Sequence, residues 1–129
     1  MDESRELISL ILSKIIEFLK SDRIKDAESL VYDENFQSVL DSSNYQDLES
    51  NWVAEINRFV NEIKDSIGVK DSVYGYFFMC SKLEMYFKIS YALKFDKISW
   101  KYLAEGQEVL NMIGYRLKEV LDEGLEIIK

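Results

Sequence analysis

Residues 73–95 read VYGYFFMCSKLEMYFKISYALKF, and this stretch decides the fold. Sixteen of its 23 residues are apolar or aromatic. Ser81, Glu84 and Lys88 are spaced so that they share one stripe of a helix, which leaves the rest of the circumference apolar. A helix of that kind is either a membrane span or the core helix of a bundle. The stretch therefore predicts a helix that other segments of the chain must cover.

The charged residues of this stretch decide between the membrane and the bundle. Four Lys and Glu side chains interrupt it, and each would cost about 2.5–3.5 kcal/mol at the centre of a bilayer. We therefore expect no membrane span. Aromatic residues and valine also favour strands, but no turn signal breaks the pattern, which is too long for one strand. A water-soluble buried helix is the better interpretation.

Apolar residues recur at helical spacing on both sides of this stretch. They predict helices over 3–20 and 44–67, a final helix of nearly thirty residues, and one or two short helices between 21 and 43. The helix over 44–67 is expected to begin with a capping box made by Ser43 and Gln46. The chain has no proline and five glycines, which favours long helices joined by short connections. We expect a single all-α domain over 1–129, an antiparallel bundle of four main helices with the 73–95 helix at its centre.

Glycines interrupt the final helix. Gly106 lies on its apolar seam and Gly114 lies next to that seam. A glycine inside a helix costs about 0.5–1 kcal/mol relative to alanine, so these positions indicate that the preceding helix comes close. The alternative is that a small ligand fits over the glycines, between the last two helices.

The residue types that are missing restrict the chemistry. There is no histidine, which excludes a Ser-His-Asp or Cys-His relay and every histidine-ligated metal site. The single cysteine, Cys80, cannot form an internal disulfide, and its apolar surroundings predict an unreactive thiol. The N-terminus is acidic where an export signal would be basic. We expect a cytoplasmic protein that is not an enzyme and uses no cofactor or metal.

The negative charge is concentrated in one segment. The net charge is −8, and residues 26–57 contain eight acids with no Lys or Arg, so the rest of the chain sums to zero. Such a run is either a solvated face or a docking surface for a basic partner. The eight acids are Asp26, Glu28, Asp33, Glu34, Asp41, Asp47, Glu49 and Glu55.

The positive charge is concentrated around residues 82–101, where lysines alternate with aromatic residues. Lysines among aromatic rings can bind single-stranded nucleic acid by stacking and phosphate contact, and Lys94, Lys97 and Lys101 are the candidates here. The net charge of −8 opposes that interpretation, because affinity for nucleic acid is chiefly electrostatic. We expect the lysines to surround a buried aromatic core, with no direct contact to nucleic acid.

These observations favour a non-enzymatic protein–protein interaction module, such as an accessory subunit, regulator or inhibitor. It would dock a basic partner through the acidic segment, and one variant of this hypothesis has the acids mimic nucleic-acid phosphates. The first alternative is a small helical subunit of a nucleoprotein complex that uses the lysine and aromatic patch. The second is an enzyme or small-molecule binder with a pocket between the last two helices. Ten of the seventeen aromatic residues lie between 74 and 102, which also suggests a homo-oligomer.

Overall fold

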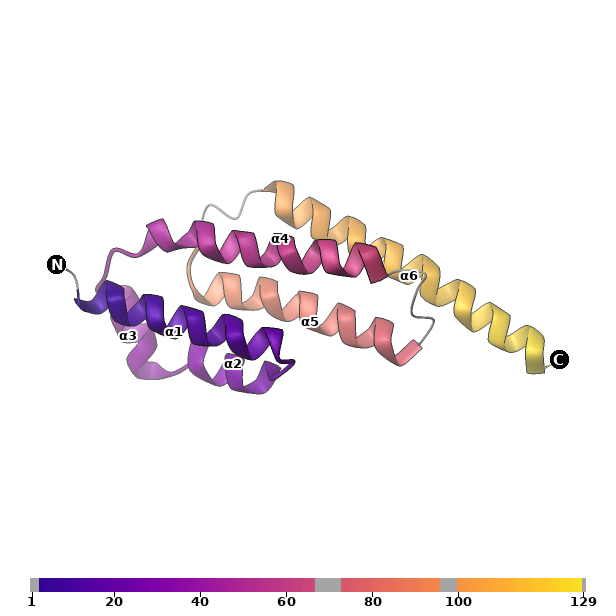
Figure 1. Cartoon of the computed structure of the whole chain (residues 1–129), viewed down its shortest axis with the longest axis horizontal. Coiled ribbons are helices and arrows are strands. Elements are labelled where there is room, and N and C mark those ends of the chain that lie inside the picture. The colour runs from indigo at the N-terminus through magenta and orange to yellow at the C-terminus, as the bar shows by residue number, and fades with distance from the viewer. Residues whose placement is uncertain (1–2, 67–72, 96–99, 129) are drawn as a thin grey trace.

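A computed structural model describes residues 3–66, 73–95 and 100–128 (Figure 1). Within these ranges all regular secondary structure is helical, which confirms the predicted all-α class. The elements are α1 (Glu3–Lys20), α2 (Ile24–Val31), α3 (Glu34–Asp41), the 3-10 helix η1 (Gln46–Leu48), α4 (Glu49–Ser66), α5 (Val73–Ala92) and α6 (Trp100–Ile128). No helix in the described ranges is both long enough and apolar enough to span a bilayer.

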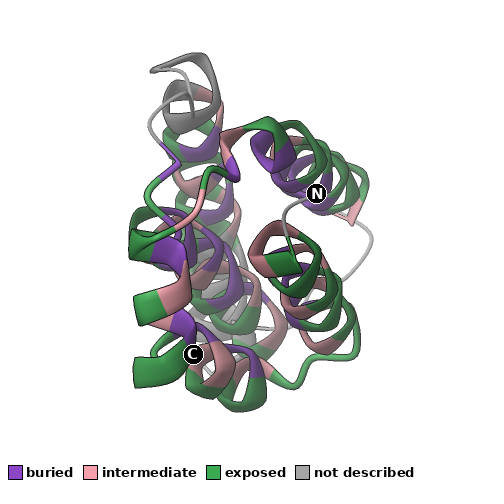
Figure 2. Cartoon of the chain, turned by 90° about the vertical axis from the view of Figure 1, so that its left-hand side faces the viewer, coloured by how far each residue is buried: buried purple, intermediate pink, exposed green. Residues whose placement is uncertain are grey.

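The helices lie lengthwise along one another, with α4 and α5 in the middle (Figure 1). Helices α1 and α2 form a hairpin, α2 and α3 contact α1, and α6 packs on both α4 and α5. Figure 2 shows the exposed residues gathered on the outer sides of the helices. The C-terminal half of α6 continues past the ends of α4 and α5. The short helices α2 and α3 agree with the pair of short helices expected from the sequence.

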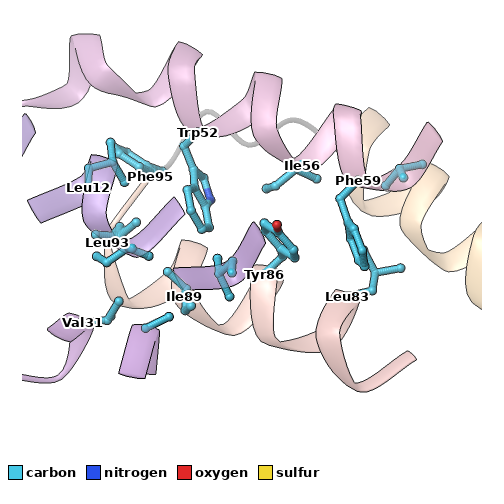
Figure 3. Close-up of a cluster of buried hydrophobic side chains, with 14 of the residues drawn as sticks. Leu12, Val31, Trp52, Ile56, Phe59, Leu83, Tyr86, Ile89, Leu93 and Phe95 are labelled. Atoms are coloured by element: carbon cyan, nitrogen blue, oxygen red, sulfur yellow. The ribbon is translucent and has the colours of Figure 1, made fainter. Parts of the chain in front are cut away.

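The core is centred on the contact between α4 and α5. The Tyr86 ring lies between Trp52 and Phe59, with ring centroids 5.6 Å and 4.9 Å away (Figure 3). Trp52 Nε1 donates to Ser90 Oγ at 2.7 Å, and Ser90 Oγ donates to the Tyr86 carbonyl at 2.7 Å. Both polar groups are buried, so these bonds prevent the desolvation cost of an unsatisfied donor. They also fix how the two helices face each other.

Helix α4 begins at Glu49, so the predicted start near residue 44 and the capping box are wrong. The reason lies in the two residues that follow α5, Leu93 and Lys94, whose carbonyls are bound by side chains of this segment. Tyr45 Oη donates to the Leu93 carbonyl at 2.6 Å, and Gln46 Nε2 donates to the Lys94 carbonyl at 3.2 Å. Gln46 is therefore used to bind the end of α5 and does not cap α4.

The prediction that α5 is covered nearly all round is wrong along one stripe. Residues at spacings of three and four are exposed along the whole helix; they are Tyr74, Phe77, Ser81, Glu84, Lys88 and Tyr91. We call this set the α5 stripe. Its three polar members are the residues that the sequence predicted to share one stripe of the helix, and its aromatic members lie on the same face. Tyr74, Phe77 and Tyr91 are 82%, 58% and 74% exposed.

Candidate interaction surfaces

The structure separates the eight acids of the acidic segment into two groups. Six lie at the surface on α2, α3 and η1, and we call them the acidic end: Asp26, Glu28, Asp33, Glu34, Asp41 and Asp47. The four of these that form ion pairs have side chains between 39% and 62% exposed. The apolar faces of α2 and α3, which include Ala27, Val31 and Phe36, are buried in the core. The packing of these faces holds the carboxylates on fixed elements.

Cations from other parts of the chain approach the acidic end. Four of its acids pair with them: Asp26 with Arg23 at 2.7 Å, Glu28 with Lys88 at 3.5 Å, Asp41 with Lys94, and Asp47 with Arg5. The hydrogen bond from Arg5 holds the pKa of Asp47 below its usual value. Water screens exposed ion pairs of this kind, so they contribute little to stability. Residues 26–57 therefore contain no Lys or Arg, but cations from outside this segment lie beside its acids in the folded protein.

Asp33 differs from the other acids because it caps α3. Its Oδ1 accepts a hydrogen bond from the Phe36 backbone N–H at 3.0 Å. This bond satisfies one of the backbone donors that a helix leaves unpaired at its N-terminus. The next residue, Glu34, is exposed. Asp33 therefore has a structural role, whereas Glu34 is available to a partner.

Glu49 and Glu55 do not belong to an exposed docking surface, contrary to the expectation. They are 4% and 6% exposed on the face of α4 that turns inward. Arg58 Nη2 approaches Glu55 Oε1 at 2.6 Å, Tyr86 Oη donates to the same oxygen at 2.9 Å, and Lys20 Nζ lies 3.7 Å from Oε2. Burial, together with Glu55, raises the pKa of Tyr86, and the hydrogen bond to Glu55 raises that of Arg58. Glu55 thus connects α1, α4 and α5 inside the protein.

The lysine and aromatic patch is only partly within the described residues. Lys94 follows the C-terminus of α5, has a left-handed backbone conformation, and pairs with Asp41. Phe95 is buried, with its ring centroid 5.9 Å from that of Tyr45. Lys97 and the side chain of Lys101 lie outside the described residues. In the described part of the patch, Lys82, Lys88 and Lys94 each pair with an acid, and the rings of Tyr86 and Phe95 belong to the core.

A small hollow of about 130 Å³ lies between the α1–α2 turn, α4 and α5. Lys82 is buried beside it, with Nζ 2.7 Å from Asp22 Oδ1 and 4.9 Å from the centre of the Phe59 ring. Phe78 and Met79 contribute apolar walls. The ammonium of Lys82 is thus compensated by protein groups. This compensation offsets the cost of burying the charged side chain of Lys82.

The two glycines of α6 have different surroundings. A Cβ atom at Gly106 would lie 2.5 Å from Phe87 Cζ, so the ring of Phe87 fills the space over this glycine. A Cβ atom at Gly114 would meet nothing within 4 Å. Among the residues that the structure describes, those lining the open hollow beside Gly114 all belong to α6 and include Leu110, Tyr115 and Lys118. The predicted close approach of α5 occurs at Gly106 through a side chain, and it does not occur at Gly114.

Within the described ranges, no group of three or more His, Cys, Asp or Glu side chains could hold a metal ion. Cys80 is half-buried, and this burial raises the pKa of its thiol, which reduces the thiolate fraction at neutral pH. Comparison of the chain with models of protein families, with curated proteins and with solved structures found no match.

Proposed function

We propose that this chain is a non-enzymatic helical interaction module that binds a basic protein partner through the acidic end. Accessory subunits, regulators and inhibitors act in this way. The observation that carries the proposal is that six acids from one short segment are held at the surface, on α2, on α3 and its N-cap, and on η1. A nucleic-acid-binding protein is one partner of suitable chemistry, because carboxylates can occupy a site that binds phosphates. The framework that we propose for the module is an antiparallel helical bundle.

The ion pairs that the acidic end already makes do not prevent docking. They are exposed and weakened by solvent screening, so a partner's lysine or arginine can replace Lys88, Lys94 or Arg5 at small cost. Contact with a partner also excludes water, which strengthens the attraction between the new charge pairs. The net charge of −8 adds long-range attraction that accelerates association with a basic surface.

The exposed acids can be tested without disturbing the fold. The test variant combines Glu34→Gln, Asp41→Asn and Asp47→Asn, and it keeps Asp33 because that residue caps α3. The control combines Asp65→Asn, Glu105→Gln and Glu108→Gln, which changes the net charge by the same amount on α4 and α6. Tagged protein is used to capture partners from its native cells at low salt after nuclease treatment, and captured proteins are identified by mass spectrometry.

A purified partner is then titrated with each variant over a series of salt concentrations. We expect the test variant to bind at least about tenfold more weakly and with a shallower salt dependence, and the control to bind like the unmodified chain. Equal binding by both variants would contradict docking at the acidic end. Capture that disappears after nuclease treatment would instead favour the nucleoprotein alternative.

A further inference from the structure

We propose that the α5 stripe is the interface of a homodimer, in which α5 of one copy packs antiparallel against α5 of a second copy. The proposal rests on the α5 stripe, which shares with the acidic end only the ion pair between Lys88 and Glu28. Figure 1 shows that the N-terminal half of α5 extends past the ends of α1 and α2. Tyr74 and Phe77 belong to this half, and both are more than half exposed. Three exposed rings on one helix face are a typical feature of a protein interface.

The stripe is complementary to itself in one antiparallel register. Its spacing of three and four is that of two helices packed side by side. When the two-fold axis lies between residues 82 and 83, Tyr74 is level with Tyr91 of the second copy, and Phe77 is level with its Lys88. Ser81 is then level with Glu84 of the second copy. These pairs are aromatic with aromatic, aromatic with cation, and hydroxyl with carboxylate.

Each of these pairs is favourable and each occurs twice, as two-fold symmetry requires. Two tyrosine rings in contact bury apolar surface while their hydroxyls reach water at the rim. The ammonium of Lys88 already lies 5.7 Å from the centre of the Tyr32 ring, so its position beside an aromatic face exists in the single chain. The hydroxyl of Ser81 can donate to the carboxylate of Glu84, which is an acceptor when ionised.

Other arrangements are less favourable. A parallel pair would place Glu84 against Glu84 and Lys88 against Lys88, and like charges at one level repel. An antiparallel pair moved by one heptad towards the C-terminus would bring Glu84 level with Lys88, but it would leave Tyr74 and Phe77 uncovered. Only the register centred between residues 82 and 83 buries all three rings of each copy.

The size of the surface predicts a weak dimer. An aromatic side chain buries about 150–250 Å² when fully covered, so six partly exposed rings with the polar groups between them bury on the order of 1,000 Å². This is at the lower limit of the range for specific interfaces. We therefore expect a dimer that dissociates at about micromolar concentration, so that its population depends on protein concentration.

Sedimentation equilibrium over about 1–500 μM measures this dimer. The test variant combines Tyr74→Ser and Phe77→Ser, and the control combines Leu10→Ser and Tyr115→Ser, which are as exposed but lie on α1 and α6. We expect the test variant to raise the dimer dissociation constant at least about tenfold and the control to leave it unchanged. A chain that stays monomeric throughout this range, or a dimer that survives in the test variant, would overturn the proposal. Circular dichroism verifies that both variants are folded.

Disulfide trapping tests the register. In a Cys80→Ser background, one preparation carries Ser81→Cys and another carries Glu84→Cys. Because residue 81 of one copy is level with residue 84 of the other, mild oxidation of the mixture should give mainly the mixed disulfide. Dominance of the disulfides between identical variants would contradict this register. Binding of a captured partner at the acidic end is measured separately, so failure of either proposal is distinguishable from failure of the other.

Discussion

The two glycines of α6 provide a matched test of how α5 and α6 pack. Both lie inside the same helix, so replacement by alanine should stabilise the helix by about 1 kcal/mol at either position. Only Gly106 faces a neighbour, since a Cβ there would lie 2.5 Å and 2.6 Å from two atoms of the Phe87 ring. Gly114 has open space. The difference between the two variants therefore isolates the cost of the contact.

The expected magnitudes follow from these distances. Overpacking of a well-filled site costs typically about 1–3 kcal/mol, so Gly106→Ala should range from nearly neutral to about 2 kcal/mol destabilising after the helical gain. Gly114→Ala should stabilise the protein by up to about 1 kcal/mol. The free energies of unfolding of the two variants should therefore differ by about 1–3 kcal/mol. Phe87→Leu should remove most of the penalty of Gly106→Ala in a double-mutant cycle.

Denaturant unfolding followed by circular dichroism measures these free energies, and an unchanged m value shows that only stability has changed. Equal stability of the two alanine variants would refute the assigned contact between Gly106 and Phe87. The same variants bear on the alternative of a ligand site between the last two helices. If small-molecule binding were found and Gly106→Ala abolished it without a loss of stability, the packing role of this glycine would be refuted.

Two further predictions concern hydrogen bonds whose loss should change the stability of the protein in a stated direction. The pKa of Tyr86 is raised by burial and by Glu55, so above about pH 10 the unfolded chain loses the phenol proton before the folded chain does, and the free energy of unfolding falls as pH rises. In Tyr86→Phe, the slope of this alkaline fall should be smaller by the contribution of one proton. An unchanged slope would contradict the raised pKa. Asp33→Ala should destabilise the protein by about 0.5–2 kcal/mol through loss of the bond to the Phe36 N–H, whereas Glu34→Ala, one residue along the chain, should change stability by less than about 0.5 kcal/mol in thermal unfolding.

The positions of the helices could be predicted from the sequence, because helical periodicity is a local property. The predicted range 3–20 coincides with α1, and the long final helix is α6. The start of α4 could not be predicted, since Gln46 contacts the end of α5, which is 48 residues away in the chain. The sequence at residues 43–46 fits a capping box, and a long-range hydrogen bond replaced it.

For the acids of residues 26–57 as well, the sequence showed the composition and only the structure showed the burial. The sequence shows that residues 26–57 contain no cation, and this count is correct. It does not show that Glu55 is buried beside Arg58 and Tyr86, because burial depends on which face of α4 meets α5. The spacing of Phe77 along the polar stripe of α5 could have indicated its exposure, but the density of apolar residues in that stretch suggested the opposite.

The sequence by itself determined the all-helical class and the absence of histidine chemistry, because backbone propensity and residue types are properties of the chain. It also determined the total charge. Only the tertiary structure decided which cations approach the acidic end, which acids are buried, and that α5 presents a row of aromatic rings to the surface. These outcomes depend on contacts between residues distant in sequence, and such contacts form only when the helices pack.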